Sequence, residues 1–122
     1  MSKTILVAED SSSIRKFIVL ALKLKGFTVI DSSDGMEALE KLPKQKIDLL
    51  ITDLNMPNID GFKLIKTIRE EPQYEKLPII ILSSLSREED IKQGIDAGAD
   101  SYLIKPFNKK RVQYEVAKYL SE

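Results

Sequence analysis

The sequence predicts an α/β fold: a three-layer (βα)5 sandwich in which helices cover both faces of a five-stranded parallel sheet. Three observations support this class. The chain has 122 residues, which is the length of one domain. Five short apolar runs alternate with longer amphipathic segments. The apolar runs are rich in branched residues without polar alternation, which is typical of parallel strands buried on both faces.

The elements follow from this alternation in chain order. The predicted strands are Thr4–Ala8, Phe27–Ser32, Leu49–Asp53, Ile79–Ser83 and Ser101–Ile104. The predicted helices are Ser12–Lys25, Met36–Leu42, Phe62–Glu70, Arg87–Ala97 and Asn108–Leu120. Proline lacks the amide hydrogen that helices and strands use, so three prolines are expected to lie outside the elements. These are Pro43, Pro72 and Pro78.

The first and last helices have the most informative sequences. Apolar residues of the first recur at intervals of three and four and form one face, at Ile14, Phe17, Ile18, Ala21 and Leu22. Gly26 stands where a helix end is expected. The last helix is expected to begin after Asn108 as its cap. The basic residues 109–111 follow and place positive charge at the positive helix end. We predict that this patch docks an acidic partner segment; the alternative is a solvated basic face.

Polar side chains stand at the ends of four predicted strands. In open parallel sheets, ligands bind beyond the carboxyl ends of the strands, where the strand order reverses. With the order 2-1-3-4-5, that point lies between the first and third strands. Glu9 and Asp10 follow the first strand, and Asp53 ends the third. We expect these carboxylates to share one crevice, with Ser83 and Lys105 at its rim.

An acidic crevice of this kind needs a counter-charge. Two carboxylates about 4 Å apart repel by about 4 kcal/mol at an effective dielectric constant of about 20. Lys105 alone does not neutralise three carboxylates, whereas an all-oxygen ligand set suits Mg²⁺, with Mn²⁺ as the alternative. The chain contains no Cys and no His, which excludes disulfides, the usual zinc sites and an imidazole base.

Composition narrows the classes of partner. The 19 basic and 19 acidic residues balance, so no global field favours nucleic acid or anionic lipid. No apolar run is long enough to span a membrane, and residues 1–3 lead into the first strand without the pattern of a signal peptide. We therefore expect a cytoplasmic protein that binds neither nucleic acid nor membrane.

At these residues the sequence resembles the receiver domains of two-component response regulators. The matching segments are ILVAEDSSSIRKFI, DLLITDLNMPNIDGFKLI, LPIIILSS and AGADSYLIKPF, which occur in order over essentially the whole chain. The resemblance implies that residues 1–122 form a single receiver domain of the flavodoxin-like, CheY-like fold. It further implies a signalling protein that assists its own phosphorylation and dephosphorylation, not an enzyme in the ordinary sense.

The resemblance also implies roles for the residues of the crevice. Asp53 is the expected phosphoacceptor for a phosphoryl group delivered by a sensor histidine kinase. Glu9, Asp10 and Asp53 are expected to hold Mg²⁺ together with the backbone carbonyl of Asn55. Lys105 is expected to pair with the phosphoryl oxygens or, before phosphorylation, with Asp53.

Two further positions are implied to form the switch. Ser83 is expected to hydrogen-bond the phosphoryl group, and the rotamer of Tyr102 is expected to follow that contact. The peptide bond between Lys105 and Pro106 is expected to be cis. Leu85 stands where receivers often have a polar residue near the attacking water, which leaves the rate of dephosphorylation open.

Simpler structural roles exist for several of these residues. Asp53 could cap the helix that follows it, and the Glu9–Asp10 pair could cap the first helix. Lys105 could be a solvated surface lysine, and Tyr102 could be a half-buried core residue. Ser83 could be an ordinary strand-end hydroxyl. The combination of four polar strand ends favours the functional interpretation.

The expected function is a phosphorylation-activated switch that signals as a monomer by protein–protein contact. A single-domain receiver most resembles the chemotaxis response regulators, whose output partner is the flagellar motor switch. The alternatives are a phosphorelay intermediate or a receiver fragment of a larger response regulator. A flavin-binding electron carrier on the same fold is an alternative from another class, but it would need phosphate-binding backbone where this chain has carboxylates.

Overall fold

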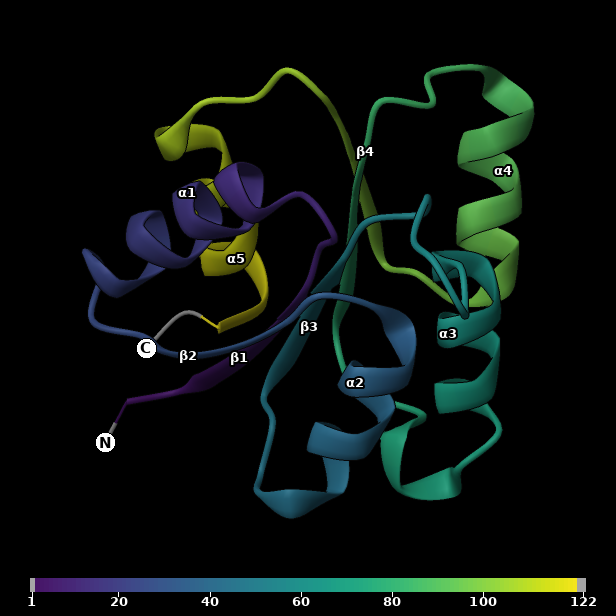
Figure 1. Ribbon diagram of the computed structural model, residues 1–122, viewed down its shortest axis with the longest axis horizontal. Helices are drawn as coiled ribbons and strands as arrows, with labels where there is room; N and C mark the ends of the chain where they lie inside the picture. Colours follow the sequence, from purple (N-terminus) through teal and green to yellow (C-terminus); the bar gives the residue numbers. More distant parts are fainter. Residues whose placement is uncertain (1, 121–122) are drawn as a thin grey trace.

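The computed structural model describes residues 2–120 and is a three-layer α/β sandwich (Figure 1). Its central sheet has five parallel strands in the order β2-β1-β3-β4-β5. The strands are β1 (Thr4–Ala8), β2 (Thr28–Ser32), β3 (Leu49–Thr52), β4 (Ile79–Ser83) and β5 (Ser101–Ile104). The predicted fold class and strand order are therefore confirmed. Among the described residues, no helix is long and apolar enough to cross a membrane.

Five α-helices connect the strands or follow them. They are α1 (Ser12–Lys23), α2 (Gly35–Lys41), α3 (Gly61–Arg69), α4 (Glu88–Ala97) and α5 (Lys109–Leu120). Helix α1 ends two residues before the predicted Lys25, and the chain then turns through Gly26 at a φ of +87°. Glycine adopts this left-handed conformation without the steric cost that a Cβ imposes.

The prediction that all three prolines lie outside regular structure is wrong for two of them. Pro43 lies in a short 3-10 helix, Leu42–Lys44, and Pro72 begins another, Pro72–Tyr74. The first residues of a helix donate no intrahelical hydrogen bond, so proline is tolerated there. Pro78 lies between elements, as predicted.

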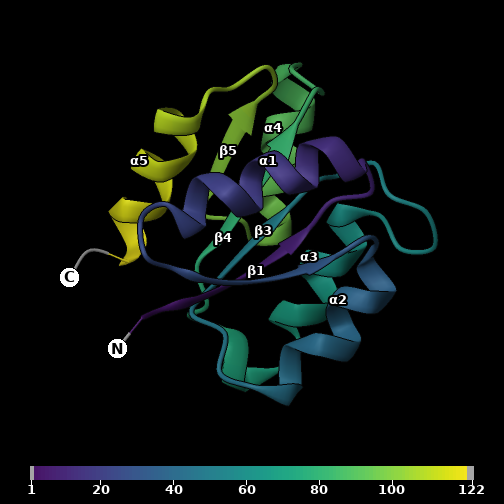
Figure 2. The ribbon, with the colours of Figure 1, turned by 60° about the vertical axis from the view of Figure 1, so that its left-hand side comes forward.

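Helices lie on both faces of the sheet (Figures 1 and 2), and an apolar layer lies between the sheet and the helices on each face. Helices α1 and α5 pack on one face, where Ile18, Leu22 and Val116 meet strand residues such as Val7 and Ile51. Helices α2, α3 and α4 pack on the other face. Alternate residues of the inner strands point into the two layers, which explains why these strands have no polar alternation.

The edge strand β2 departs from the expectation that every strand is buried on both faces. Thr28 and Asp31 are exposed, and Val29 and Ile30 are half-buried. β2 has a neighbouring strand on one side only, so its outer flank is open to solvent. The inner strands β3 and β4 are buried along their whole length.

The helix caps decide two questions that the sequence left open. Ser11 accepts a hydrogen bond from the Ile14 amide at 3.4 Å and caps α1, and Asp60 accepts from the Lys63 amide at 2.9 Å and caps α3. Neither the Glu9–Asp10 pair nor Asp53 therefore serves as a helix cap. All three side chains remain available at the carboxyl ends of the strands.

The chain enters and leaves the fold at one end. β1 begins, and α5 ends, at the amino-terminal edge of the parallel sheet (Figure 2). The acidic residues after β1 and β3 lie at the opposite, carboxyl-terminal edge. Arg69 reinforces the amino-terminal edge, because its guanidinium donates to the carbonyls of Gly98 and Tyr74 at 2.8 and 2.7 Å.

Candidate functional site

Glu9, Asp10 and Asp53 come together at the carboxyl-terminal edge of the sheet. Each offers one carboxylate oxygen, and these oxygens lie within 4.8 Å of one another. Glu9 is 1% exposed and Asp53 is 6% exposed, whereas Asp10 faces solvent. The three residues therefore form a crevice with two buried carboxylates and one open side.

Backbone hydrogen bonds between neighbouring strands hold the two buried acids in place. The Asp53 amide donates to the Ala8 carbonyl at 2.9 Å, and the Glu9 amide donates to the Ser32 carbonyl at 3.1 Å. β1 lies between β2 and β3, so this arrangement follows from the strand order. Parallel strands end at a common edge, which is why residues 44 positions apart meet here.

The loop after Asp53 packs closely against the strand end. An added Cβ at Gly61 would lie 2.2 Å from the Asp53 carbonyl oxygen, so no larger side chain fits there. Asn58 adopts a left-handed φ of +70° and donates to the Asp34 carboxylate at 2.9 Å. These contacts fix the loop that contains Asn55, which is exposed two residues beyond Asp53.

Lys105 reaches the crevice from the end of β5. Its ammonium lies 3.1 Å from Glu9 Oε1 and 3.4 Å from Asp53 Oδ2, and the side chain is 17% exposed. Lys105 is therefore not a solvated surface lysine, and it bridges two carboxylates instead of one. The Lys105–Pro106 peptide bond is cis, as the resemblance implied.

One positive charge does not balance this crevice. The pKa of Glu9 rises from its ordinary 4.5 to about 7, chiefly because burial disfavours the carboxylate. The hydrogen bond from the Ser11 amide, at 3.1 Å, opposes this effect, repulsion from Asp53 adds to it, and Lys105 opposes it. A group of acids that holds a proton near neutral pH is one that a further cation would stabilise.

The donor set fits Mg²⁺ or Mn²⁺. All of the ligand atoms that the crevice offers are carboxylate oxygens, which these hard cations prefer. The exposed side of the crevice, next to Asp10, leaves room for the water ligands that Mg²⁺ retains. Glu9, Asp10 and Asp53 are the residues that could hold such an ion.

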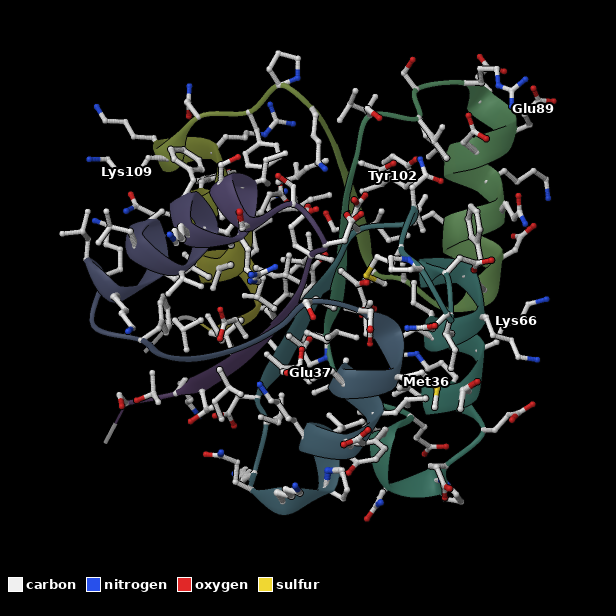
Figure 3. All side chains as sticks on the ribbon, viewed as in Figure 1. Met36, Glu37, Lys66, Glu89, Tyr102 and Lys109 are labelled. Carbon is white, nitrogen blue, oxygen red and sulfur yellow. The ribbon has the colours of Figure 1, made fainter. Side chains whose placement is uncertain are left out.

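The backbone of Leu85 joins Ser83 to Tyr102. Ser83 is fully buried, and its Oγ accepts a hydrogen bond from the Leu85 amide at 3.1 Å. The Tyr102 hydroxyl donates to the carbonyl of the same residue at 2.6 Å. The Tyr102 ring packs beside Gly94 of α4 (Figure 3), and burial raises the pKa of its phenol. Sequence reasoning missed this link, because a backbone group leaves no sequence signal.

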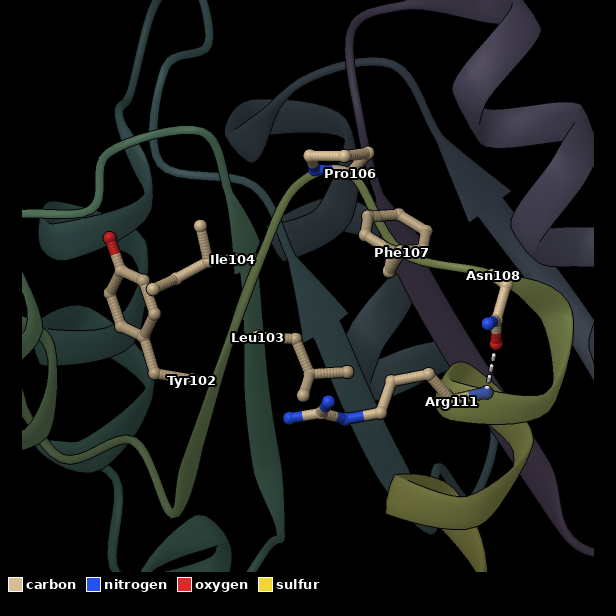
Figure 4. Close-up of a pocket in the computed structure, with 7 residues that line it drawn as sticks. All are labelled: Tyr102, Leu103, Ile104, Pro106, Phe107, Asn108 and Arg111. Carbon is tan, nitrogen blue, oxygen red and sulfur yellow. Dashed lines mark hydrogen bonds between the residues drawn. The ribbon is translucent and has the colours of Figure 1, made fainter.

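Two cavities lie on either side of the segment after β5. The first, of about 530 Å³, is lined by Ser13, Ile14, Phe17, Ser84, Lys105, Pro106 and Phe107. The second, of about 650 Å³, is lined by Tyr102, Leu103, Ile104, Pro106, Phe107, Asn108 and Arg111 (Figure 4). Arg111 extends along this second cavity, so the predicted basic patch borders a partly apolar groove.

Arg15 also belongs to the site, although the sequence did not indicate it. Its guanidinium donates to the Glu9 carbonyl at 2.7 Å and lies 3.4 Å from the Asp31 carboxylate of β2. An arginine in the first turns of a helix that follows an acidic pair is the signal that could have revealed it. Such an arginine can reach back to the preceding carbonyls.

Comparison with known proteins agrees with this geometry. The chain is 38% identical over 116 residues to the alkaline phosphatase synthesis transcriptional regulatory protein PhoP of Bacillus subtilis, covering 95% of this chain and 48% of PhoP. Chemotaxis protein CheY4 of Vibrio cholerae superposes with a TM-score of 0.93 at 34% identity, covering 98% of this chain and 100% of that one.

A third relative was crystallised with a metal. The receiver domain of sensor histidine kinase PA1611 from Pseudomonas aeruginosa, described with a magnesium ion coordinated in its active site cleft, has a TM-score of 0.91 at 26% identity over the whole of both chains. The chain spans less than half the length of the curated relatives that it matches. The family model for the response regulator receiver domain matches residues 5–117. The chain belongs to the receiver domain family of two-component response regulators.

Proposed function

We propose that this domain is a switch that accepts a phosphoryl group from a sensor histidine kinase on Asp53. Glu9, Asp10 and Asp53 would hold Mg²⁺ together with the backbone carbonyl of Asn55. The observation that supports this best is that the Asp53 carboxylate lies close to the acidic pair and 3.4 Å from the Lys105 ammonium. A nucleophile is held there beside a cation and a metal-binding set.

The two oxygens of Asp53 are in different environments. Oδ1 accepts a hydrogen bond from the Leu54 amide at 2.8 Å, which fixes the plane of the carboxylate. Oδ2 faces Lys105. We assign Oδ2 as the attacking oxygen, with Lys105 compensating the charge on the transferring phosphoryl oxygens. When bound, Mg²⁺ supplies further charge compensation to the same oxygens.

The same geometry explains why this chain needs no histidine for the reaction. Phosphoryl transfer depends mainly on positioning and charge compensation, and the leaving group belongs to the kinase. The pKa of Glu9 is about 7 in the metal-free protein, so metal binding by its carboxylate near neutral pH would be coupled to the loss of a proton. Ser11 and Lys105 both donate to the Glu9 carboxylate and hold it in the crevice during this change.

The switch is proposed to act through Ser83, Leu85 and Tyr102. A phosphoryl group on Asp53 brings strong acceptor oxygens to the crevice, and the buried Ser83 hydroxyl is their proposed donor. Ser83 Oγ accepts from the Leu85 amide, so its reorientation disturbs the backbone of Leu85, whose carbonyl accepts from Tyr102. The rearrangement would pass to α4 and to the groove that Arg111 borders.

The output is proposed to be a protein contact, with chemotaxis as its setting and the flagellar motor switch as its partner. The structural similarity to a chemotaxis protein, with a TM-score of 0.93 at 34% identity, supports that setting. PhoP favours an alternative: the receiver portion of a longer transcriptional regulator. A phosphorelay intermediate is a third possibility. In each case we propose a cytoplasmic monomer, and the carboxylates after β1 disfavour a flavin carrier.

The proposed reaction is tested by incubation with acetyl phosphate and MgCl₂, followed by mass spectrometry of the intact and digested protein. We expect one added phosphoryl group, located at Asp53, and its loss in Asp53→Asn and in samples treated with chelator. Asp96→Asn, on the exposed face of α4, is the matched control and retains the modification. Modification at Ser83 or Ser84 instead would overturn the assignment of Asp53.

A further inference from the structure

The segment between β1 and α1 holds two of the three acidic residues but is only three residues long, 9–11. Three carboxylates with oxygens within 4.8 Å repel one another, so this segment experiences a force that separates Asp10 and Glu9 from Asp53. Its backbone must be restrained if the carboxylates are to stay together before a cation arrives.

Arg15 provides such a restraint from inside α1. Its Nη1 donates to the Glu9 carbonyl at 2.7 Å and lies 3.5 Å from the Asp10 carbonyl. The guanidinium thus contacts the peptide groups of both acidic residues, not their carboxylates. The side chain is 19% exposed, and its contact with the Glu9 carbonyl is partly buried.

The other side of the guanidinium is anchored to the sheet. Arg15 Nε lies 3.4 Å from the carboxylate of Asp31, which stands beside Val7 in the register of β1 and β2. The planar fork therefore joins the acidic segment to an adjacent strand. Lysine has a single flexible ammonium and cannot hold a carbonyl and a carboxylate in this fixed geometry.

We propose that Arg15 is a positioning residue that holds the backbone of Glu9 and Asp10 so that their carboxylates converge with Asp53 on a divalent cation. This inference rests on the proposed function, because it concerns the metal site that phosphorylation of Asp53 requires. Arg15 touches no substrate atom, and it acts through the two carbonyls.

The direction in which Mg²⁺ affinity changes on removal of Arg15 distinguishes a positioning role from a purely electrostatic effect. If Arg15 were merely a positive charge near the site, its removal would strengthen Mg²⁺ binding, because like charges repel. If Arg15 positions the acidic segment, its removal weakens Mg²⁺ binding despite the favourable change in charge. Loss of outer contacts that orient metal ligands commonly weakens binding by about tenfold or more.

The experiment is isothermal titration of the purified protein with MgCl₂ for the wild type, Arg15→Ala, Arg15→Lys and Lys16→Ala. We expect Arg15→Ala to bind Mg²⁺ about tenfold more weakly, with Arg15→Lys in between. Lys16→Ala removes an equal charge from the next, exposed residue and leaves the affinity unchanged or slightly higher. Equal or tighter binding by Arg15→Ala would overturn the proposal.

A second readout needs no metal. Amide hydrogen exchange in EDTA should be about tenfold faster in residues 9–13 of Arg15→Ala than of the wild type, with β3 and β4 unchanged. Unchanged exchange in residues 9–13 would also overturn the positioning role. A wild type that binds no Mg²⁺ would defeat the proposed function, and the exchange result alone would then decide the role of Arg15.

Discussion

The ammonium of Lys105 lies 3.1 Å from the carboxylate of Glu9, although 96 residues separate the two in the chain. The same ammonium lies 3.4 Å from Asp53, so one cation is shared by two buried acids. Sharing leaves the crevice short of positive charge. Burial of these acids therefore lowers the unfolding free energy of the metal-free protein. Changes of pH and substitutions in the crevice can measure this cost.

Stability should fall as pH rises from about 5 to 8 in EDTA. Glu9 has a pKa of about 7 when folded and 4.5 ordinarily, so in this range the folded protein binds more protons than the unfolded chain. Unfolding free energy then decreases with pH, by about 1 to 3 kcal/mol in total. The hydrogen bond from the Ser33 amide lowers the pKa of Glu37. Glu37 therefore changes the stability only below about pH 4.5 and does not contribute between pH 5 and 8. Urea denaturation at pH 5.5 and 8 measures the difference, and Glu9→Gln should abolish most of it.

Asp10→Asn should weaken Mg²⁺ binding by more than about tenfold, because it removes a charged ligand from the open side of the crevice. Glu9→Gln should act more mildly, since the amide oxygen can still accept from Lys105. Calorimetric titration with MgCl₂ at pH 8 compares both variants with Asp96→Asn, a surface control far from the cluster. Wild-type affinity in Asp10→Asn would mean that the proposed metal site is wrong.

Ser83→Ala should still accept a phosphoryl group but should lose the backbone change that phosphorylation causes in the wild type. The variant lacks the hydroxyl that we propose as the link between the phosphoryl oxygens and the Leu85 amide, so residues 84–87 should show no change in hydrogen exchange on treatment with a beryllium fluoride phosphoryl mimic. The wild type should show that change. Most of the gain in partner affinity should disappear with it, and a full response in Ser83→Ala would exclude this coupling.

Tyr102→Phe should cost about 1 kcal/mol of stability, because it leaves the Leu85 carbonyl without the hydroxyl donor at 2.6 Å. Mg²⁺ affinity should be unaffected, since Tyr102 lies outside the acidic cluster. Chemical denaturation and metal titration of the same sample separate the two effects. A large loss of Mg²⁺ affinity would contradict the assigned route from Ser83 to α4.

Gly61→Ala should destabilise the fold by about 3 kcal/mol or more, because the new methyl group meets the Asp53 carbonyl at 2.2 Å. Gly26→Ala is the matched control. Its Cβ would meet open space, and the cost is that of a φ of +87°, about 1 kcal/mol. Urea midpoints rank the two variants, and equal values would show that the loop after Asp53 adapts more than its packing indicates.

The strand ends could be predicted from the sequence because they depend on local patterns and one general rule. Apolar runs predict strands, parallel strands end at a common edge, and Glu9, Asp10 and Asp53 therefore meet. The contacts of Arg15 and the two hydrogen bonds of the Leu85 backbone depend on side-chain conformations set by distant packing. The 3-10 helices at Pro43 and Pro72, and the exposed flank of β2, likewise depend on neighbours that no local window contains.

The placement of the two ends of the domain has a consequence for how it can be combined with other domains. β1 begins and α5 ends at the edge of the sheet that lies opposite the crevice. A polypeptide joined at either end would therefore begin on the side of the sheet that lies away from the crevice. This placement suits a domain that is one part of a longer protein, as in the curated relatives, of which the matched region is less than half.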